Sequence, residues 1–97
     1  MATMTATGEA LLVNEVGLHA RPSVKLTQLA RRFASAIEFA VAPDGPWTDA
    51  KSPVKVMRVK AAKGARLYLR CHGPDAEAAL EAVRRLIDGG FEEEPAL

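Results

Sequence analysis

The sequence predicts a small α+β domain in which helices cover one face of a four-stranded antiparallel sheet. Two kinds of periodicity alternate along the chain. Short segments with apolar residues at every second position are typical of half-buried strands, and longer segments with an apolar residue every three or four positions are typical of amphipathic helices. The resulting order is βαββαβα. Because each strand can bury only one face, we expect the helices to form a second layer on that face.

The first half of the chain contains one helix and three strands. Residues 10–14 form a short apolar run of strand length, and residues 23–34 carry apolar side chains on one side of a helix. Residues 36–41 alternate in the manner of a strand, and the turn sequence at 43–46 ends this strand. A short return strand is expected at 47–51.

The second half contains a short helix, the fourth strand and a longer helix. Ser52 followed by Pro53 is typical of a helix start, an N-cap residue and then a first-turn proline, and predicts a helix over residues 54–59. Residues 66–71 give the clearest strand pattern, with one apolar and one amphipathic face, so one side of the sheet is expected to be solvated. An apolar stripe over residues 76–87 predicts the last helix.

Length and charge limit what the protein can be. A chain of 97 residues suits one domain spanning 1–97, with a core at about 9–91 and loose ends at 1–7 and 92–97. The formal net charge of +1 provides no overall basic field of the kind that nucleic-acid binding requires. A protein or phosphoryl partner therefore fits better than a nucleic acid.

The cysteine and histidine content argues against a disulfide or a metal site. The single cysteine, Cys71, excludes an intramolecular disulfide, and its neighbour His72 would point to the opposite face of a strand. Residues 1–8 lack the basic and apolar regions of a signal peptide, and no apolar run reaches membrane length. We expect a cytoplasmic protein with no metal, no cofactor and no membrane insertion.

The run Gly-Leu-His-Ala-Arg-Pro at residues 17–22 is the candidate functional motif. It places His19 just before a helix start, because Pro22 is tolerated in a first turn, where its missing N–H has no partner to lose. Unpaired N–H groups at a helix N-terminus favour anions, and the Arg21 guanidinium suits phosphate oxygens. Two interpretations follow from the residues alone: His19 carries a phosphoryl group, or it merely caps the helix or fills a loop.

Three motifs resemble those of HPr, the histidine-containing phosphocarrier family of the bacterial phosphotransferase system. Residues 17–22 resemble the active-site signature of the family. Residues 49–57 are similar to its second motif, which holds a regulatory serine, and residues 86–91 resemble its usual C-terminal ending. The likeness extends over about 9–93, with the motifs in the order and spacing of the family, so it is specific.

This resemblance implies a fold and a function. The fold is an open-faced β-sandwich with strand order 1-4-2-3. The function is a stoichiometric phosphoryl carrier rather than an enzyme: Nδ1 of His19 accepts a phosphoryl group from phospho-enzyme I and passes it to the IIA unit of a sugar permease. Arg21 stabilises the phosphate. We expect a monomer.

Ser52 has two interpretations. It matches a position that an ATP-dependent kinase, the HPr kinase/phosphorylase, phosphorylates in many members of the family, and it is also a good plain N-cap. Two departures from the family pattern lie beside it, because Pro53 replaces an aliphatic residue and Lys55 replaces a common glycine. The sequence leaves regulation open.

Family members dock partners through a shallow apolar surface around the histidine. The matching positions here are Val24, Pro53, Val54 and Met57, with Arg31 and Arg58 at the rim. Methionine suits a surface that serves several partners, because its side chain is flexible. An ordinary amphipathic helix would also account for Met57.

Two other functions remain open. One is a carrier of the nitrogen-related branch of the phosphorelay, which serves regulation rather than transport; its members often replace the proline, so Pro22 argues mildly against it. The other is a non-catalytic co-regulator with the same fold, against which the presence of both His19 and Arg21 argues.

Overall fold

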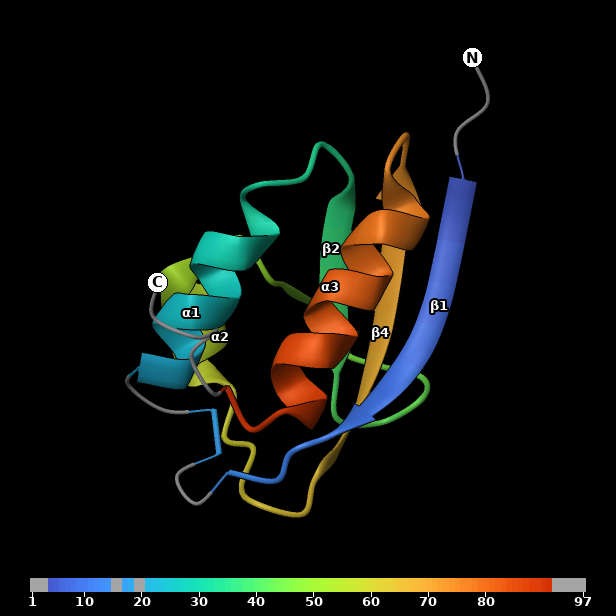
Figure 1. Ribbon diagram of the computed structural model, residues 1–97. Coiled ribbons are helices and arrows are strands. Elements are labelled where there is room, and N and C mark those ends of the chain that lie inside the picture. The colour runs from blue at the N-terminus through green and yellow to red at the C-terminus, as the bar shows by residue number, and fades with distance from the viewer. Residues whose placement is uncertain (1–3, 15–16, 19–20, 92–97) are drawn as a thin grey trace.

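Seven elements follow one another in the predicted order within residues 4–14, 17–18 and 21–91, the part of the chain that the computed structural model describes. They are β1 (Met4–Leu11), α1 (Arg21–Ala30), β2 (Ala36–Ala40), β3 (Thr48–Asp49), α2 (Pro53–Arg58), β4 (Arg66–Gly73) and α3 (Ala76–Asp88). Figure 1 shows the sheet behind α1 and α3.

The strands form one antiparallel sheet in the order β1-β4-β2-β3, which confirms the prediction. Strand β4 is central. It pairs with β1 along its whole length, from Gly73 opposite Met4 to Arg66 opposite Leu11. On its other side it pairs with β2, where Cys71 lies opposite Ile37.

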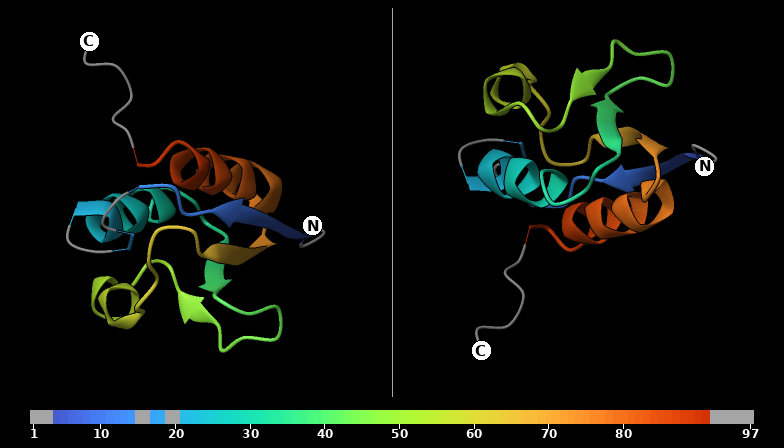
Figure 2. Two further views of the ribbon diagram at one scale, coloured as in Figure 1. Left: turned by 90° about the horizontal axis from the view of Figure 1, so that it is seen from below. Right: turned by 90° about the horizontal axis from the view of Figure 1, so that it is seen from above.

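The two longer helices cover one face of the sheet. Figure 2, seen from below and above, shows α1 and α3 on the same side, with α2 beside β3. Leu67, Leu69 and Cys71 of β4 are buried toward this layer, whereas the alternating residues of β4 are exposed or half-buried on the other face. The open-faced sheet predicted from the 66–71 pattern is therefore confirmed. The largest fully buried side chains of the core are Phe39, Leu12, Leu18, Leu26, Ile37, Leu67, Leu69, Ile87, Val56 and Val83.

Strand β1 lies earlier in the chain than predicted. The apolar run predicts a strand at 10–14 and a loose end at 1–7, whereas the strand spans Met4–Leu11, so residues 4–7 belong to it. This segment is rich in threonine, alanine and glycine and lacks a local signal, and pairing with β4 orders it. We conclude that β1 depends on its neighbour more than on its own sequence.

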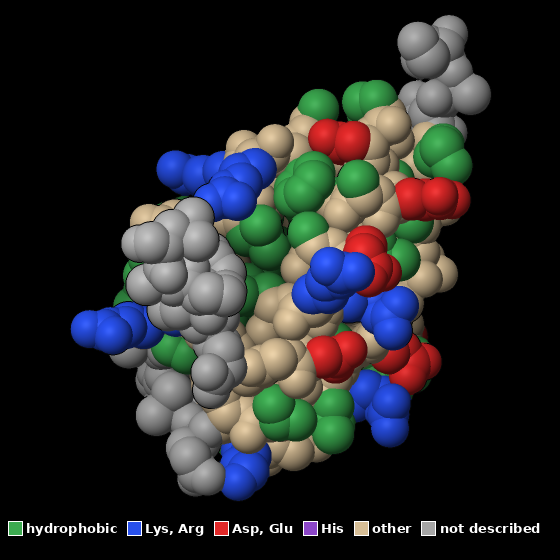
Figure 3. All heavy atoms as spheres, viewed as in Figure 1, with side chains coloured by type: hydrophobic (Ala, Val, Ile, Leu, Met, Phe, Trp, Pro, Cys, Tyr) green, Lys and Arg blue, Asp and Glu red, His purple; other side chains and the backbone are tan. Residues whose placement is uncertain are grey.

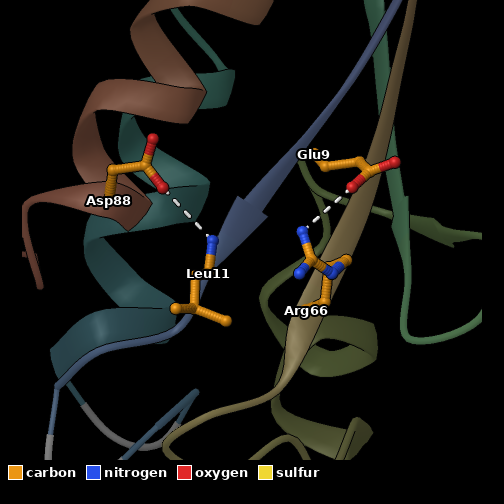
Figure 4. A network of polar contacts seen from close by, with 4 residues as sticks. All are labelled: Glu9, Leu11, Arg66 and Asp88. Carbon is orange, nitrogen blue, oxygen red and sulfur yellow. Dashed lines mark hydrogen bonds and ion pairs between the residues drawn. The ribbon is translucent and has the colours of Figure 1, made fainter.

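Contacts to two elements fix the end of β1 (Figure 4). The Leu11 N–H donates to Oδ1 of Asp88 on α3 at 3.2 Å, and Glu9 forms an ion pair with Arg66 on β4 at 3.1 Å. Asp88 thus satisfies a backbone donor at the sheet edge, where no further strand is present in the described residues. Both side chains of the ion pair are more than half exposed, so this pair contributes little to stability.

Helix α1 begins and ends earlier than its apolar pattern predicts. The pattern gives 23–34, whereas the helix spans Arg21–Ala30. The N–H groups of Ala34 and Ser35 donate instead to the carboxylate of Asp75, at 3.0 and 2.9 Å. Because this partner lies at the start of α3, the helix is ended by a tertiary contact.

The remaining elements follow their patterns with shifted ends. Strand β3 is only Thr48–Asp49, shorter than the predicted 47–51. Trp47, just before it, stacks on Arg70 on the open side of the sheet, with the guanidinium carbon 4.1 Å from the ring centre. Helix α2 is confirmed within one residue of the prediction at each end, with Ser52 as its N-cap.

Candidate functional site

The loop before α1 is closed by Asn14. His19 and Ala20, the centre of the predicted motif, lie outside the described residues, so the site is defined here by their neighbours. The Gly17 N–H donates to the Asn14 carbonyl at 3.2 Å, and Nδ2 of Asn14 donates back to the Gly17 carbonyl at 2.8 Å. Gly17 has a φ of 62°, which a glycine adopts without strain. The sequence predicted only that Asn14 closes a strand.

The connection between α2 and β4 forms a hydrogen bond with Leu18, the residue after Gly17. The Leu18 N–H donates to the Ala61 carbonyl at 3.0 Å, and the Leu18 side chain is 1 % exposed. A Cβ on Gly17 would lie 2.2 Å from the same Ala61 oxygen, so only glycine fits there. The chain therefore enters position 19 from a fixed anchor. No sequence signal marked Ala61, because the contact joins distant segments.

On the other side of position 19, α1 starts at Arg21. Pro22 occupies the first turn, as predicted, and is buried, whereas the Arg21 side chain is exposed. The first turn contains no acidic residue that would neutralise the positive end of the helix dipole. Lys25, one turn on, donates through Nζ to the Phe91 carbonyl at 2.8 Å and ties α1 to the chain after α3. An anion near this helix end would meet the positive end of the helix dipole and a guanidinium.

Three predicted docking residues are exposed apolar side chains on two helices that pack against each other. Val24 on α1 is 45 % exposed, and Val54 and Met57 on α2 are 59 % and 53 % exposed. Pro53 is exposed as well. An exposed apolar group of this kind is typical of an interaction surface.

Charge is distributed unevenly around this surface. Neither α1 nor α2 contains an acidic residue. Within the described residues, four of the cations on or next to α1 and α2 lack an ion pair, whereas two arginines of β4 and one of α3 have one. The unpaired cations are Arg21, Arg32, Lys55 and Arg58, and the pairs are Arg66–Glu9, Arg70–Glu38 and Arg85–Glu81. Among the described residues, Figure 3 shows Lys and Arg side chains at the α1 end and mixed charges over α3 and β1.

Ser52 caps α2. Its Oγ accepts a hydrogen bond from the Lys55 N–H at 3.3 Å, and its backbone is extended, with φ −103° and ψ 108°. The side chain is half-buried. The capping role is therefore present, and it does not decide whether the hydroxyl is also phosphorylated.

Cys71 and His72 point to opposite faces of β4, as predicted. Burial raises the pKa of the Cys71 thiol to about 11, and the nearby Asp75 carboxylate adds to this shift. His72 is exposed, and its Nδ1 lies 2.7 Å from the Thr5 hydroxyl. Among the described residues, no group of three His, Cys, Asp or Glu side chains is arranged to hold a metal ion.

An open-faced sandwich with strand order 1-4-2-3 is the fold that the resemblance to phosphocarrier proteins implies, and comparison with known proteins places the chain in that class. Residues 6–88 match the family model described as the PTS HPr component phosphorylation site. The chain is 42 % identical over 82 residues to the phosphocarrier protein HPr of Cupriavidus necator. The alignment covers 84 % of this chain and 90 % of that protein. It is 32 % identical over 91 residues to the phosphocarrier protein NPr of Escherichia coli, covering 94 % and 100 %.

A solved structure agrees as well. The crystal structure of an HPr from Thermoanaerobacter tengcongensis superposes with a TM-score of 0.77 at 33 % identity, covering 98 % of this chain and 100 % of that one. The chain belongs to the HPr family of phosphocarrier proteins of the phosphotransferase system. No helix in the part of the chain that the structure describes is long and apolar enough to cross a membrane.

Proposed function

We propose that this protein accepts a phosphoryl group on Nδ1 of His19 from phospho-enzyme I and passes it to the IIA unit of a sugar permease in the cytoplasm. The observation that carries the proposal is the anchoring around position 19. Asn14 and Ala61 fix the loop before it, and Arg21 stands exposed at the helix start after it. The residues just before position 19 are thus anchored by hydrogen bonds, and the helix start after it offers a positive charge to a phosphoryl group.

The transfer needs few groups from the carrier. The N–P bond on the donor histidine breaks as a new one forms at Nδ1 of His19. In a second transfer the bond at His19 breaks as the phosphoryl group bonds to the acceptor side chain of the next protein. Phosphoryl transfer depends mainly on positioning and on charge stabilisation. The Arg21 guanidinium and the positive end of the α1 dipole would meet the phosphoryl charge without holding it so strongly that it cannot leave.

The partners would dock on the exposed apolar residues of α1 and α2. Val24, Pro53, Val54 and Met57 give this docking surface its apolar part. The unpaired cations around it favour a partner whose matching surface is apolar at its centre and acidic at its rim. Such a surface speeds encounter at low ionic strength.

A carrier of the nitrogen-related branch is the second candidate. The alignment with the Escherichia coli NPr covers the whole of that protein. Pro22, buried in the first turn of α1, favours the sugar-uptake branch, because the other branch often replaces it. Phosphorylation by enzyme I of each branch, compared at equal concentration, separates the two.

The test of the function is phosphorylation of wild type and two histidine variants. With enzyme I and phosphoenolpyruvate, we expect wild type and His72→Ala to gain an acid-labile, base-stable phosphate and His19→Ala to gain none. His72 is the matched control, because it is an exposed histidine bonded to Thr5 and distant in sequence from the loop. Equal labelling of His19→Ala would contradict the proposal.

A further inference from the structure

Lys51 has all three of its polar groups engaged, although it lies in a turn between β3 and α2. Its N–H donates to Oδ1 of Asp49 at 2.9 Å, and its carbonyl accepts from Nε of Arg31 at 3.1 Å. Its Nζ is half-buried and donates to the Phe33 carbonyl at 2.7 Å. A lysine in a surface turn ordinarily keeps its ammonium in water. Both the backbone and the side chain of Lys51 are therefore fixed by hydrogen bonds within the protein.

Two of these bonds cross between α1 and the start of α2. Arg31 and Phe33 belong to the turn that ends α1, and Lys51 directly precedes Ser52, the N-cap of α2. Arg31 donates one bond to Lys51, and Lys51 donates the other to Phe33, so the two hydrogen bonds together form a two-point clamp. Two bonds fix the direction of a segment, whereas one bond leaves it free to pivot. The ammonium also lies where a cation is favoured, at the C-terminal end of a helix.

Few side chains of helix α2 enter the core. Of its six residues only Val56 is buried. A helix of this length is not stable by itself, and most helical stability in proteins comes from packing. With one core side chain, α2 depends on contacts at its ends for its orientation. Its start is also tied by the Ala50 and Ser52 N–H groups, which donate to the Ile37 and Asp49 carbonyls at 2.8 and 3.2 Å. The clamp at Lys51 acts at this point.

We propose that Lys51 is a positioning residue that sets the orientation of α2 relative to α1. It thereby aligns Val54 and Met57 with Val24 as one docking surface. The proposal rests on the proposed function, because only a phosphoryl carrier of this kind uses the docking surface to bind its partners. Lys51 acts through the two helices and does not touch the phosphoryl group.

The experiment compares Lys51→Met with Lys51→Arg and with Lys60→Met as a control. Lys60 is an exposed lysine just after α2, without a partner among the described residues. Backbone N–H residual dipolar couplings report the angle between α1 and α2. Enzyme I-dependent phosphorylation gives KM for the carrier and kcat separately. We expect Lys51→Met to change the couplings of α2 and to raise KM roughly fivefold or more with little change in kcat. Lys51→Arg should restore both values, and Lys60→Met should match wild type.

Each outcome decides the matter. Unchanged couplings in Lys51→Met, or changed couplings with an unchanged KM, overturn the proposal. A KM difference that disappears on adding salt also overturns it, because the lysine charge would then act on the partner directly. If wild type accepts no phosphate, the proposed function fails, and the couplings still decide whether the clamp exists. Should Lys51→Met not fold, Arg31→Met removes only the other bond of the clamp and is measured in the same way.

Discussion

Asp75 and Ser35 hold each other across the fold: the Ser35 hydroxyl donates to Oδ1 of Asp75 at 2.5 Å, and the Asp75 N–H donates to the Ser35 Oγ at 3.1 Å. The N–H groups of Ala34 and Ser35 donate to the same carboxylate. The Ser35 hydroxyl, with these N–H groups, lowers the pKa of Asp75 below its ordinary value of 3.8. One carboxylate thus joins the end of α1 to the start of α3.

The first prediction concerns acid stability. Because the pKa of Asp75 is lower in the folded state than in the unfolded state, its contribution to stability is complete above the ordinary value of 3.8 and is lost as the pH falls through the lowered pKa. Asp75→Asn should therefore lower Tm at neutral pH, and its difference from wild type should shrink in acid. Thermal unfolding across this range measures it. Asp44→Asn, at an exposed turn residue, is the control, and a gap that stays constant with pH would contradict the prediction.

The second prediction separates backbone strain from a clash in the histidine loop. Gly17 and Gly64 both have positive φ, 62° and 94°, so alanine at either position is strained. A Cβ at Gly17 would also meet the Ala61 carbonyl at 2.2 Å, whereas nothing lies within 4 Å of one at Gly64. Gly17→Ala should therefore lose more stability than Gly64→Ala, for which we expect about 1 kcal/mol.

The same pair of variants tests the anchor. If the Leu18–Ala61 bond fixes the entry to position 19, Gly17→Ala should also slow phosphorylation by enzyme I, and Gly64→Ala should not. Denaturant unfolding and initial rates of labelling give the two quantities. Equal losses in both variants would show that the contact with Ala61 is unimportant.

The parts of the fold with a local signal were predictable from the sequence. The alternation in β4 and the stripe of α3 each depend on residues within one segment. The start of β1 at Met4 and the end of α1 at Ala30 were not predictable, because each depends on a partner far along the chain: Gly73 in the first case and Asp75 in the second. Pairing and capping across the fold outweighed local preference at both points.

The candidate site divides in the same way. Its chemical residues, His19 and Arg21, were predicted because they form a contiguous motif beside a helix start. The residues that support it were missed. Ala61 contributes only its backbone carbonyl, and Lys51 is a lysine of the kind found in many solvated turns. The residues next to them in sequence therefore gave no indication of either role.

The third prediction concerns Arg21. Its side chain is exposed and has no ion pair in the described residues, so Arg21→Ala should leave the stability of the fold almost unchanged. Loss of a charge-assisted hydrogen bond to the phosphoryl group should slow transfer roughly tenfold or more. Rapid-quench labelling measures the rate. Arg84→Ala removes an exposed arginine of α3, away from the docking surface, and serves as the control; equal rates for wild type and Arg21→Ala would remove the role assigned to the guanidinium.

The last prediction concerns Ser52, which caps α2 through its bond to the Lys55 N–H. If capping is its whole task, Ser52→Ala should cost about 1 kcal/mol and Ser52→Asp almost nothing, because aspartate caps as well as serine. Neither change should then alter phosphorylation of His19.

If Ser52 is instead a regulatory phosphorylation site, Ser52→Asp should keep its stability and lose transfer. The added carboxylate would lie beside the exposed Val54 and Met57, and its desolvation in a docked complex is unfavourable unless it is paired. Lys55, three residues on, is unpaired in the described residues and could neutralise that charge, so Lys55→Gly in the Ser52→Asp background should deepen the loss. Transfer rates and thermal unfolding of these variants give both quantities. Full transfer by Ser52→Asp, with and without Lys55, would leave Ser52 as a helix cap alone.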